Sequence, residues 1–243
     1  MANPTSDGNG EPPRRARAPV FAPRRDLCLD YANTLGWRGG ASAETLHGLP
    51  DLVKWCAAAG GLLAGTIGAG ADWGGAAWCA RHPAQAAAIF NRAIAIRETL
   101  YRVFHAVASG GAPADDDLAE LNRAFKETPA RSALQRAGTG FGWRVEPTRA
   151  AGAPALLAPA LWSAGDLLAG AHLARVRECA NGECLWLFLD ESKNGTRRWC
   201  SMSACGNRAK AHRHYARLKG GGGSAALTSR RAFLSSRRCP SPC

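Results

Sequence analysis

The stretch RECANGECLWLFLDESKNGTRRWCSMSACGNRAKAHRHYARLK (residues 177–219) holds four of the nine cysteines of this 243-residue chain. Cys179 and Cys184 enclose four residues, Cys200 and Cys205 enclose four more, and 15 residues separate the pairs. Two short cysteine pairs at this spacing are typical of a tetrahedral zinc site with four thiolate ligands. Because cysteine fills every ligand position and leaves none for water, we expect one zinc ion with a structural role.

The residues between and after the pairs predict how the site is built. Residues 185–189 form an apolar run of strand length, Asn194-Gly195 is a strong turn signal, and residues 196–200 suit a returning strand. Residues 206–219 are helix-like, and the helix dipole stabilises a thiolate at the N-terminus. The sequence thus predicts a small treble-clef-like zinc finger, with a knuckle, a β-hairpin and a helix.

Two other interpretations of the cysteines stay open. Two disulfides would use all four, but residues 1–25 contain no secretory signal, so we expect a cytoplasmic protein, where disulfides are rare. An iron–sulfur cluster also takes four cysteines, although paired spacing around a hairpin favours zinc. We expect Cys28, Cys56 and Cys79 to be small buried apolar residues, and Cys239 and Cys243 lie in the C-terminal tail.

The net charge of +12 is concentrated in particular segments of the chain. Residues 1–25 carry +3, residues 26–174 carry −1, residues 175–219 carry +6, and the tail from 220 to 243 adds four arginines. Positive charge concentrated in this way attracts a polyanionic partner, most often nucleic acid. The alternative is a solvated basic surface that has no partner.

The cations of the finger are the candidate nucleic-acid contacts. Arginine and lysine bind phosphate, and a guanidinium also reads guanine O6 and N7. On a helix, Arg213 and Arg217 lie one turn apart with Lys210 beside them, whereas Tyr215 and Leu218 are expected to pack inward. The alternative is that these cations only keep a small module soluble. The candidates are Arg197, Arg198, Arg208, Lys210, Arg213 and Arg217.

Residues 26–174 predict a mostly α-helical domain. Apolar spacing and helix-end signals indicate helices within residues 46–63, 83–111, 115–128 and 155–179, and residues 141–149 suggest a short strand. Residues 1–25 and the segment after the linker Gly220–Gly223 are expected to be disordered basic tails. The longest uncharged run, residues 55–71, is shorter than the roughly 20 apolar residues of a membrane span, so no membrane association is expected.

Taken together, residues 177–219 resemble the CGNR zinc finger, which is named for the tetrapeptide found here as Cys205-Gly206-Asn207-Arg208. LDYANT (residues 29–34) and the helical segments after it resemble the ABATE domain that precedes this finger. The resemblance implies a bacterial stress-induced transcription regulator with a DNA-binding finger, and it supports the four cysteines as zinc ligands. RNA or a protein is the alternative partner of the finger.

Within the ABATE-like region, Asp30 and Asn33 are candidates for a small-molecule pocket that would sense an effector. The alternative is that they cap a helix or bond to backbone, as Asp and Asn usually do near helix starts. No activated nucleophile or acid–base pair stands out in the sequence, so we expect no enzyme activity. A homodimer formed through the helical domain would enlarge the small DNA footprint of a single finger.

Overall fold

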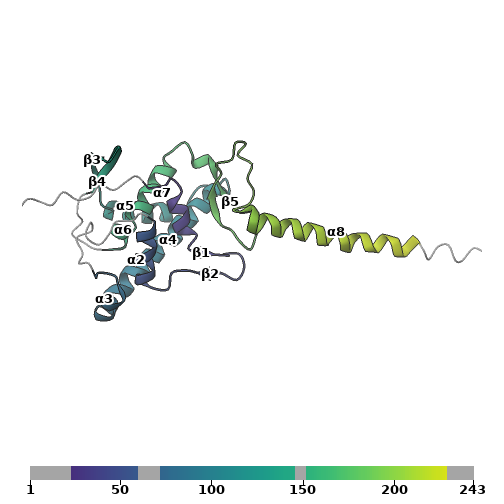
Figure 1. Ribbon diagram of the computed structural model, residues 1–243, viewed down its shortest axis with the longest axis horizontal. Helices are drawn as coiled ribbons and strands as arrows, with labels where there is room; N and C mark the ends of the chain where they lie inside the picture. Colours follow the sequence, from purple (N-terminus) through teal and green to yellow (C-terminus); the bar gives the residue numbers. More distant parts are fainter. Residues whose placement is uncertain (1–22, 60–71, 146–151, 229–243) are drawn as a thin grey trace, which may run out of the picture.

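The computed structural model describes residues 23–59, 72–145 and 152–228. Helices gather into one body, from which a long C-terminal helix extends as a single rod (Figure 1). The helices are α1 Leu27–Ala32, α2 Leu49–Ala58, α3 Ala76–Arg81, α4 Pro83–Ala108, α5 Asp115–Glu127, α6 Ala153–Leu156, α7 Ala158–Leu168 and α8 Asn207–Thr228, with short turns η1 Leu173–Arg175 and η2 Met202–Gly206. The mainly α domain and the small C-terminal finger match the predicted fold class.

Small antiparallel pairs of strands complete the described part of the chain. β1 (Leu35–Gly36) pairs with β2 (Ala43–Glu44), β3 (Arg131–Ala137) with β4 (Gly140–Val145), and β5 (Val176–Glu178) with β6 (Leu187–Leu189). The predicted strand at 141–149 is present as β4, and residues 146–149 lie outside the described residues. Its partner β3 was not predicted, because its alternating burial shows only weakly in the sequence.

Helix α4 lies at the centre of the body, as its long apolar stripe predicts. It begins at Pro83, whose missing N–H is harmless in the first turn of a helix. Ile96, Leu100 and Val103 on this stripe are at most 1% exposed. The helix packs against α1, α2, α5 and the β5–β6 pair. The central helix thus connects the helical body with the start of the finger.

The hydrophobic core does not stop at the finger. Val176, Leu187 and Leu189 from β5 and β6 belong to the same buried cluster as the helices of the body. A second, smaller cluster contains Cys179, Cys184 and Cys205. The hairpin at the start of the finger is therefore built on the body, and only the cysteine cluster forms a core of its own.

The chain differs from the sequence predictions at the two ends of the finger. The helix predicted over 155–179 is interrupted at Leu157 and after α7, because Pro159 lies in the first turn of a new helix and Gly170 follows the end of that helix. Where Gly220–Gly223 predicted a linker, α8 continues to Thr228, since each added residue of an established helix gains a hydrogen bond. The predicted tails at residues 1–22 and 229–243 lie outside the described residues. No described helix is both long and apolar enough to cross a membrane.

Candidate metal centre

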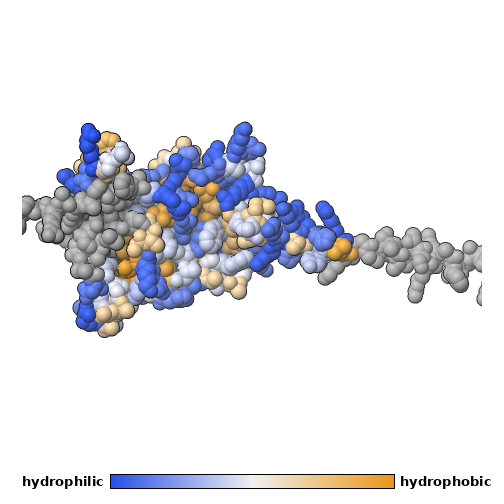
Figure 2. Space-filling model, in the orientation of Figure 1, coloured by the Kyte–Doolittle hydropathy of each residue, from blue (hydrophilic) through white to orange (hydrophobic). Residues whose placement is uncertain are grey.

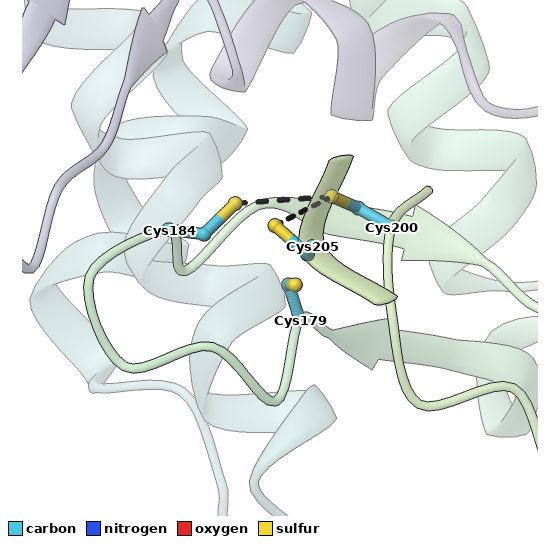
Figure 3. Close-up of side chains that lie close together, drawn as sticks. All are labelled: Cys179, Cys184, Cys200 and Cys205. Atoms are coloured by element: carbon cyan, nitrogen blue, oxygen red, sulfur yellow. Dashed lines mark hydrogen bonds between the residues drawn. The ribbon is translucent and has the colours of Figure 1, made fainter. Parts of the chain in front are cut away.

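Four cysteine side chains converge on one point beside the start of α8 (Figure 3). Their Sγ atoms all lie within 4.8 Å of one another. The Cys184–Cys200 and Cys200–Cys205 sulfur pairs are each 3.8 Å apart. Sulfurs at the corners of a tetrahedron, each about 2.3 Å from a zinc ion, are separated by about 3.8 Å. The four cysteines therefore form a site for one structural zinc ion.

The first cysteine pair sits at the tip of the β5–β6 hairpin. Cys179 donates its backbone N–H to the Trp186 carbonyl at 2.9 Å, which continues the ladder by one residue. Cys184 donates its N–H to the Asn181 carbonyl at 2.8 Å and so closes a tight turn. Leu185 follows in the left-handed region with φ of 53°. Residues 179–185, called the knuckle below, thus direct both sulfurs inward.

The second pair is tied to the first through the backbone. The Ala180 N–H donates to the Arg198 carbonyl at 2.9 Å, which places the segment before Cys200 against the knuckle. Cys205 lies in η2, where the Gly206 N–H donates to the Ser201 carbonyl at 3.0 Å. Because α8 begins at Asn207, the zinc site fixes the first turn of that helix.

The predicted hairpin between the two pairs is wrong. β6 pairs with β5, upstream of it, and residues 196–200 are not a strand. The buried carboxylate of Asp190 accepts the backbone N–H groups of Ser192 and Arg197, each at 2.9 Å, and this closes residues 190–197 into a loop. Hydrogen bonds from Ser192 first, and then from Arg197, lower the pKa of Asp190. An Asp bonded two residues on is the signal that predicts such a loop.

Burial and hydrogen bonds shift the pKa values of the clustered thiols in different directions. Burial raises the pKa of Cys184 to about 12 and that of Cys200 in the same direction. Burial opposes ionisation of Cys205 as well, but a hydrogen bond from the Asn181 side chain, 3.6 Å from Sγ, and the neighbouring thiols outweigh it and lower the pKa. Zinc binds the thiolate form, so zinc binding releases the protons of these thiols.

The remaining described cysteines lie away from this cluster. Cys28 and Cys56 are buried in the main core, and burial raises the pKa of each to about 12. Cys79 is half-buried against the same core. These positions suit the small apolar role that the sequence predicted. Cys239 and Cys243 lie outside the described residues.

The predicted nucleic-acid contacts fall into two groups. Lys210, Arg213 and Arg217 are exposed on α8, and Arg198 is exposed just before Cys200. The guanidinium of Arg197, by contrast, donates to the carbonyls of Trp199 and Cys200 and lies 4.6 Å from the ring centroid of Phe188. That side chain is used within the finger.

The inward packing predicted for the apolar side chains of α8 is wrong. Tyr215 is 65% exposed and Leu218 is 61% exposed. The sequence pattern suggested a buried side, but the helix leaves the body after its first turns and has no surface there to pack against (Figure 1). The exposure of residues 210–218 on all sides distinguishes α8 from the helices of the body.

The two pocket candidates in LDYANT have different partners. Asn33 is 3% exposed, and its side-chain amide bonds to the backbone of Leu187 in β6. Asp30 is half-exposed and pairs with Arg24. Backbone bonding was the alternative interpretation of these residues, and the contacts of Asn33 fit it.

Several residues that join distant segments of the chain, within the body and between body and finger, were missed in the sequence. The Tyr101 hydroxyl lies 3.2 Å from the Leu185 carbonyl oxygen and 3.3 Å from a carboxylate oxygen of Glu178. Arg97 is 2% exposed and forms a bidentate pair with Glu44, with both bonds at 2.8 Å. These partners are more than 50 residues apart in the chain, and no local pattern marks them.

Comparison with known families agrees with the two-part architecture. Residues 175–218 match the model of the CGNR zinc finger. Residues 25–171 match the ABATE model, whose description is "Putative stress-induced transcription regulator". No curated protein matches the chain. Since the ABATE match covers more than half of the sequence, the chain belongs to the ABATE family and carries a CGNR zinc finger after that domain.

Proposed function

We propose that this protein is a cytoplasmic, non-enzymatic transcription regulator that binds duplex DNA through α8. One observation carries the proposal: α8 projects from the body, begins at the zinc site, and contains no acidic residue between Asn207 and Thr228. Hydrophilic side chains run from the finger out along the helix on the visible face (Figure 2). A helix with cations and no anions attracts a polyanion along its length.

The cations of α8 are arranged on one side. Lys210, Arg213 and Arg217 are spaced by three and four residues, with His214 between them, so they share one face of the helix. The three cations cover about 10 Å along the helix axis at a rise of about 1.5 Å per residue. The major groove of B-DNA is about 12 Å wide and admits a single α-helix. This face of α8 can therefore contact the phosphates that line one groove of the duplex.

The zinc site supplies the position of that helix. Zinc bound by the four thiolates holds Cys205, and thus the first turn of α8, against the knuckle. A helix exposed on all sides gains little from packing, so a fixed start favours its formation. Arg198, two residues before Cys200, is exposed and adds a further cation to the finger.

A binding titration tests the proposal. The zinc-loaded chain is titrated against fluorescent duplex DNA, duplex RNA and single-stranded RNA at several salt concentrations. We expect duplex DNA to bind and the variant Arg213→Ala/Arg217→Ala to bind it more weakly. The matched control is Arg136→Ala, an exposed arginine on β3, which is at the opposite end of the body from α8 in Figure 1.

The outcomes separate the candidate partners. Preference for either RNA over duplex DNA replaces the proposal with the RNA-binding alternative. If none of the three probes binds, a protein is the remaining candidate partner of the finger. Unchanged DNA binding by the double variant shows that α8 is not the contact surface.

A further inference from the structure

A short loop of the helical domain docks on the knuckle of the zinc finger. The loop, residues 37–40, is called the docking loop and lies between β1 and β2. The Gly39 N–H donates to the Glu183 carbonyl at 3.2 Å. A Cβ on Gly39 would stand 1.8 Å from the Gly182 carbonyl oxygen, so only glycine permits this approach. The backbones of the two family regions thus touch directly.

Trp37 extends the same contact to the metal site. Its side chain packs against the cluster of Cys179, Cys184 and Cys205. Its backbone has φ of 54°, in the left-handed region that bulky residues rarely adopt. A tryptophan kept in a disfavoured conformation is held there by its surroundings. Those surroundings include the sulfur cluster and one residue of α8.

That residue of α8 is Arg208, the last residue of the CGNR tetrapeptide. The Arg208 guanidinium lies 4.6 Å from the ring centroid of Trp37. It also lies 3.7 Å from a carboxylate oxygen of Glu183. Arg208, whose side chain is 49% exposed, therefore contacts both the helical domain and the knuckle, whereas Lys210 and Arg217 lie farther along α8.

We propose that Arg208 is a positioning residue, which fixes the direction in which α8 leaves the helical body through its contacts with Trp37 and Glu183. The other residues of the tetrapeptide also have structural partners. Cys205 lies in the sulfur cluster, and the Asn207 side chain donates to the Ser203 carbonyl at 3.3 Å. In this proposal Arg208 positions the helix, whereas the sequence predicted a phosphate contact for it.

The first test needs no DNA. Backbone ¹⁵N relaxation is measured on the zinc-loaded full chain, together with the indole N–H resonance of Trp37, which is assigned with Trp37→Phe. In the wild type, amides of residues 209–216 should tumble with those of α4. We expect Arg208→Ala to lower their heteronuclear NOE values and to shift the Trp37 resonance. The matched control on the same helix, Arg213→Ala, should change neither.

Two further variants separate positioning from general stability. Arg208→Lys keeps the charge beside Glu183 but lacks the planar group that stacks on an aromatic ring, so it should restore the signals only in part. Gly39→Ala should loosen α8 as Arg208→Ala does, because it displaces the docking loop from the other side. Zinc content is measured for every variant and should stay at the wild-type value. Wild-type relaxation and a wild-type Trp37 resonance in Arg208→Ala would overturn the proposal.

The second test uses DNA and rests on the proposed function. Loss of a contact of the Arg208–Trp37 kind should weaken binding by about 3- to 10-fold. The slope of log K against log[salt] should keep its wild-type value, because no phosphate contact is removed, whereas Arg213→Ala should reduce it by about 0.9. A reduced slope in Arg208→Ala would show a phosphate contact and contradict positioning. If no variant binds DNA, the proposed function fails, and the relaxation measurements alone decide the role of Arg208.

Discussion

The side-chain amide of Asn33 pairs with both backbone polar groups of Leu187. Its Nδ2 donates to the Leu187 carbonyl at 2.7 Å, and its Oδ1 accepts the Leu187 N–H at 3.0 Å. Asn33 belongs to the ABATE region and Leu187 to the zinc finger. The Asn33 amide thus forms the two hydrogen bonds that the backbone of a neighbouring strand would form with the outer edge of β6. This contact makes the finger continuous with the body.

Replacing Asn33 by alanine should therefore destabilise the whole protein. Both polar groups of Leu187 would lose their partner in a buried site, at a cost of about 1–3 kcal/mol for each group. We expect the free energy of unfolding, measured in urea, to fall by about 3 kcal/mol in total. The exposed Asn122→Ala on α5 is the matched control and should change it by less than about 0.5 kcal/mol. A loss of that smaller size in Asn33→Ala would show that this amide does not join the two regions.

Metal content should depend on the four clustered cysteines alone. We expect one zinc per wild-type chain and loss of that zinc in Cys200→Ser, because a site with three thiolates binds it far more weakly. Cys56→Ser, in the main core, should keep the metal even if it lowers stability. Elemental analysis of chelator-washed protein measures both. Zinc retained in Cys200→Ser at the wild-type level would refute the ligand set.

Removal of zinc should affect the two halves of the finger differently. Val176, Leu187 and Leu189 lie in the main core, so β5 and β6 should survive chelation. The start of α8 is held by the cysteine cluster, so chelation should reduce the helical signal at 222 nm. Hydrogen exchange with and without chelator assigns the change to segments. Equal protection loss in β5–β6 and α8 would contradict this division.

Replacing Asp190 should weaken zinc binding without touching a ligand. Asp190→Ala leaves the N–H groups of Ser192 and Arg197 without their acceptor, and the loop that leads to Cys200 loses its closure. Supporting residues of a metal site typically change affinity about 10- to 100-fold, and we expect the lower end. Competition with a chromophoric chelator measures the change, with exposed Glu191→Ala as control. Equal zinc affinities of the two variants would show that the loop does not position Cys200.

Stability should fall in acid because of the carboxylates around Arg97. Burial opposes ionisation of Glu44 and Glu98, but hydrogen bonds from Arg97 to Glu44 and from Arg38 to Glu98 outweigh it, and the pKa of each carboxyl lies below its ordinary value of 4.5. For a lowered folded-state pKa, the stabilisation is complete above 4.5 and is lost as pH falls through the folded value. Unfolding in urea between pH 7 and pH 3 should show this loss.

The variant Glu44→Gln isolates that effect. It should be less stable at pH 7 and should lose less stability than the wild type on going to pH 3, because the titrating group is gone. Exposed Glu191→Gln is the control and should follow the wild-type curve. Parallel curves for Glu44→Gln and the wild type would show that the Arg97–Glu44 pair does not contribute to the pH dependence.

The zinc site and the long helices were predictable because their signals are local. Cys179, Cys184, Cys200 and Cys205 show the ligand spacing directly, and the apolar stripe of α4 repeats with the helical period. The partner of β6 was not predictable in this way. The predicted turn at Asn194-Gly195 is present, with φ of 62° at Gly195. It lies in a loop that is closed by hydrogen bonds to Asp190, and it does not connect two strands of a hairpin.

The contacts between body and finger could not be predicted from the sequence for another reason. Asn33 and Leu187 are 154 residues apart, and Tyr101 and Glu178 are 77 apart. Such pairs form only when packing brings distant segments together, and their residue types have many other uses. Arg208 shows the consequence: its charge suggested nucleic acid, whereas its position beside Trp37 was invisible in the sequence.

The salt dependence of DNA binding by the zinc-loaded chain tests the central claim most directly. If Arg213 and Arg217 contact phosphates, log K should fall linearly with log[salt], and the double variant Arg213→Ala/Arg217→Ala should have a slope shallower by about 1.8. The control Arg136→Ala should keep the wild-type slope. A flat wild-type response, or a double variant with the wild-type slope and affinity, would contradict the assignment of α8 as the DNA-binding element.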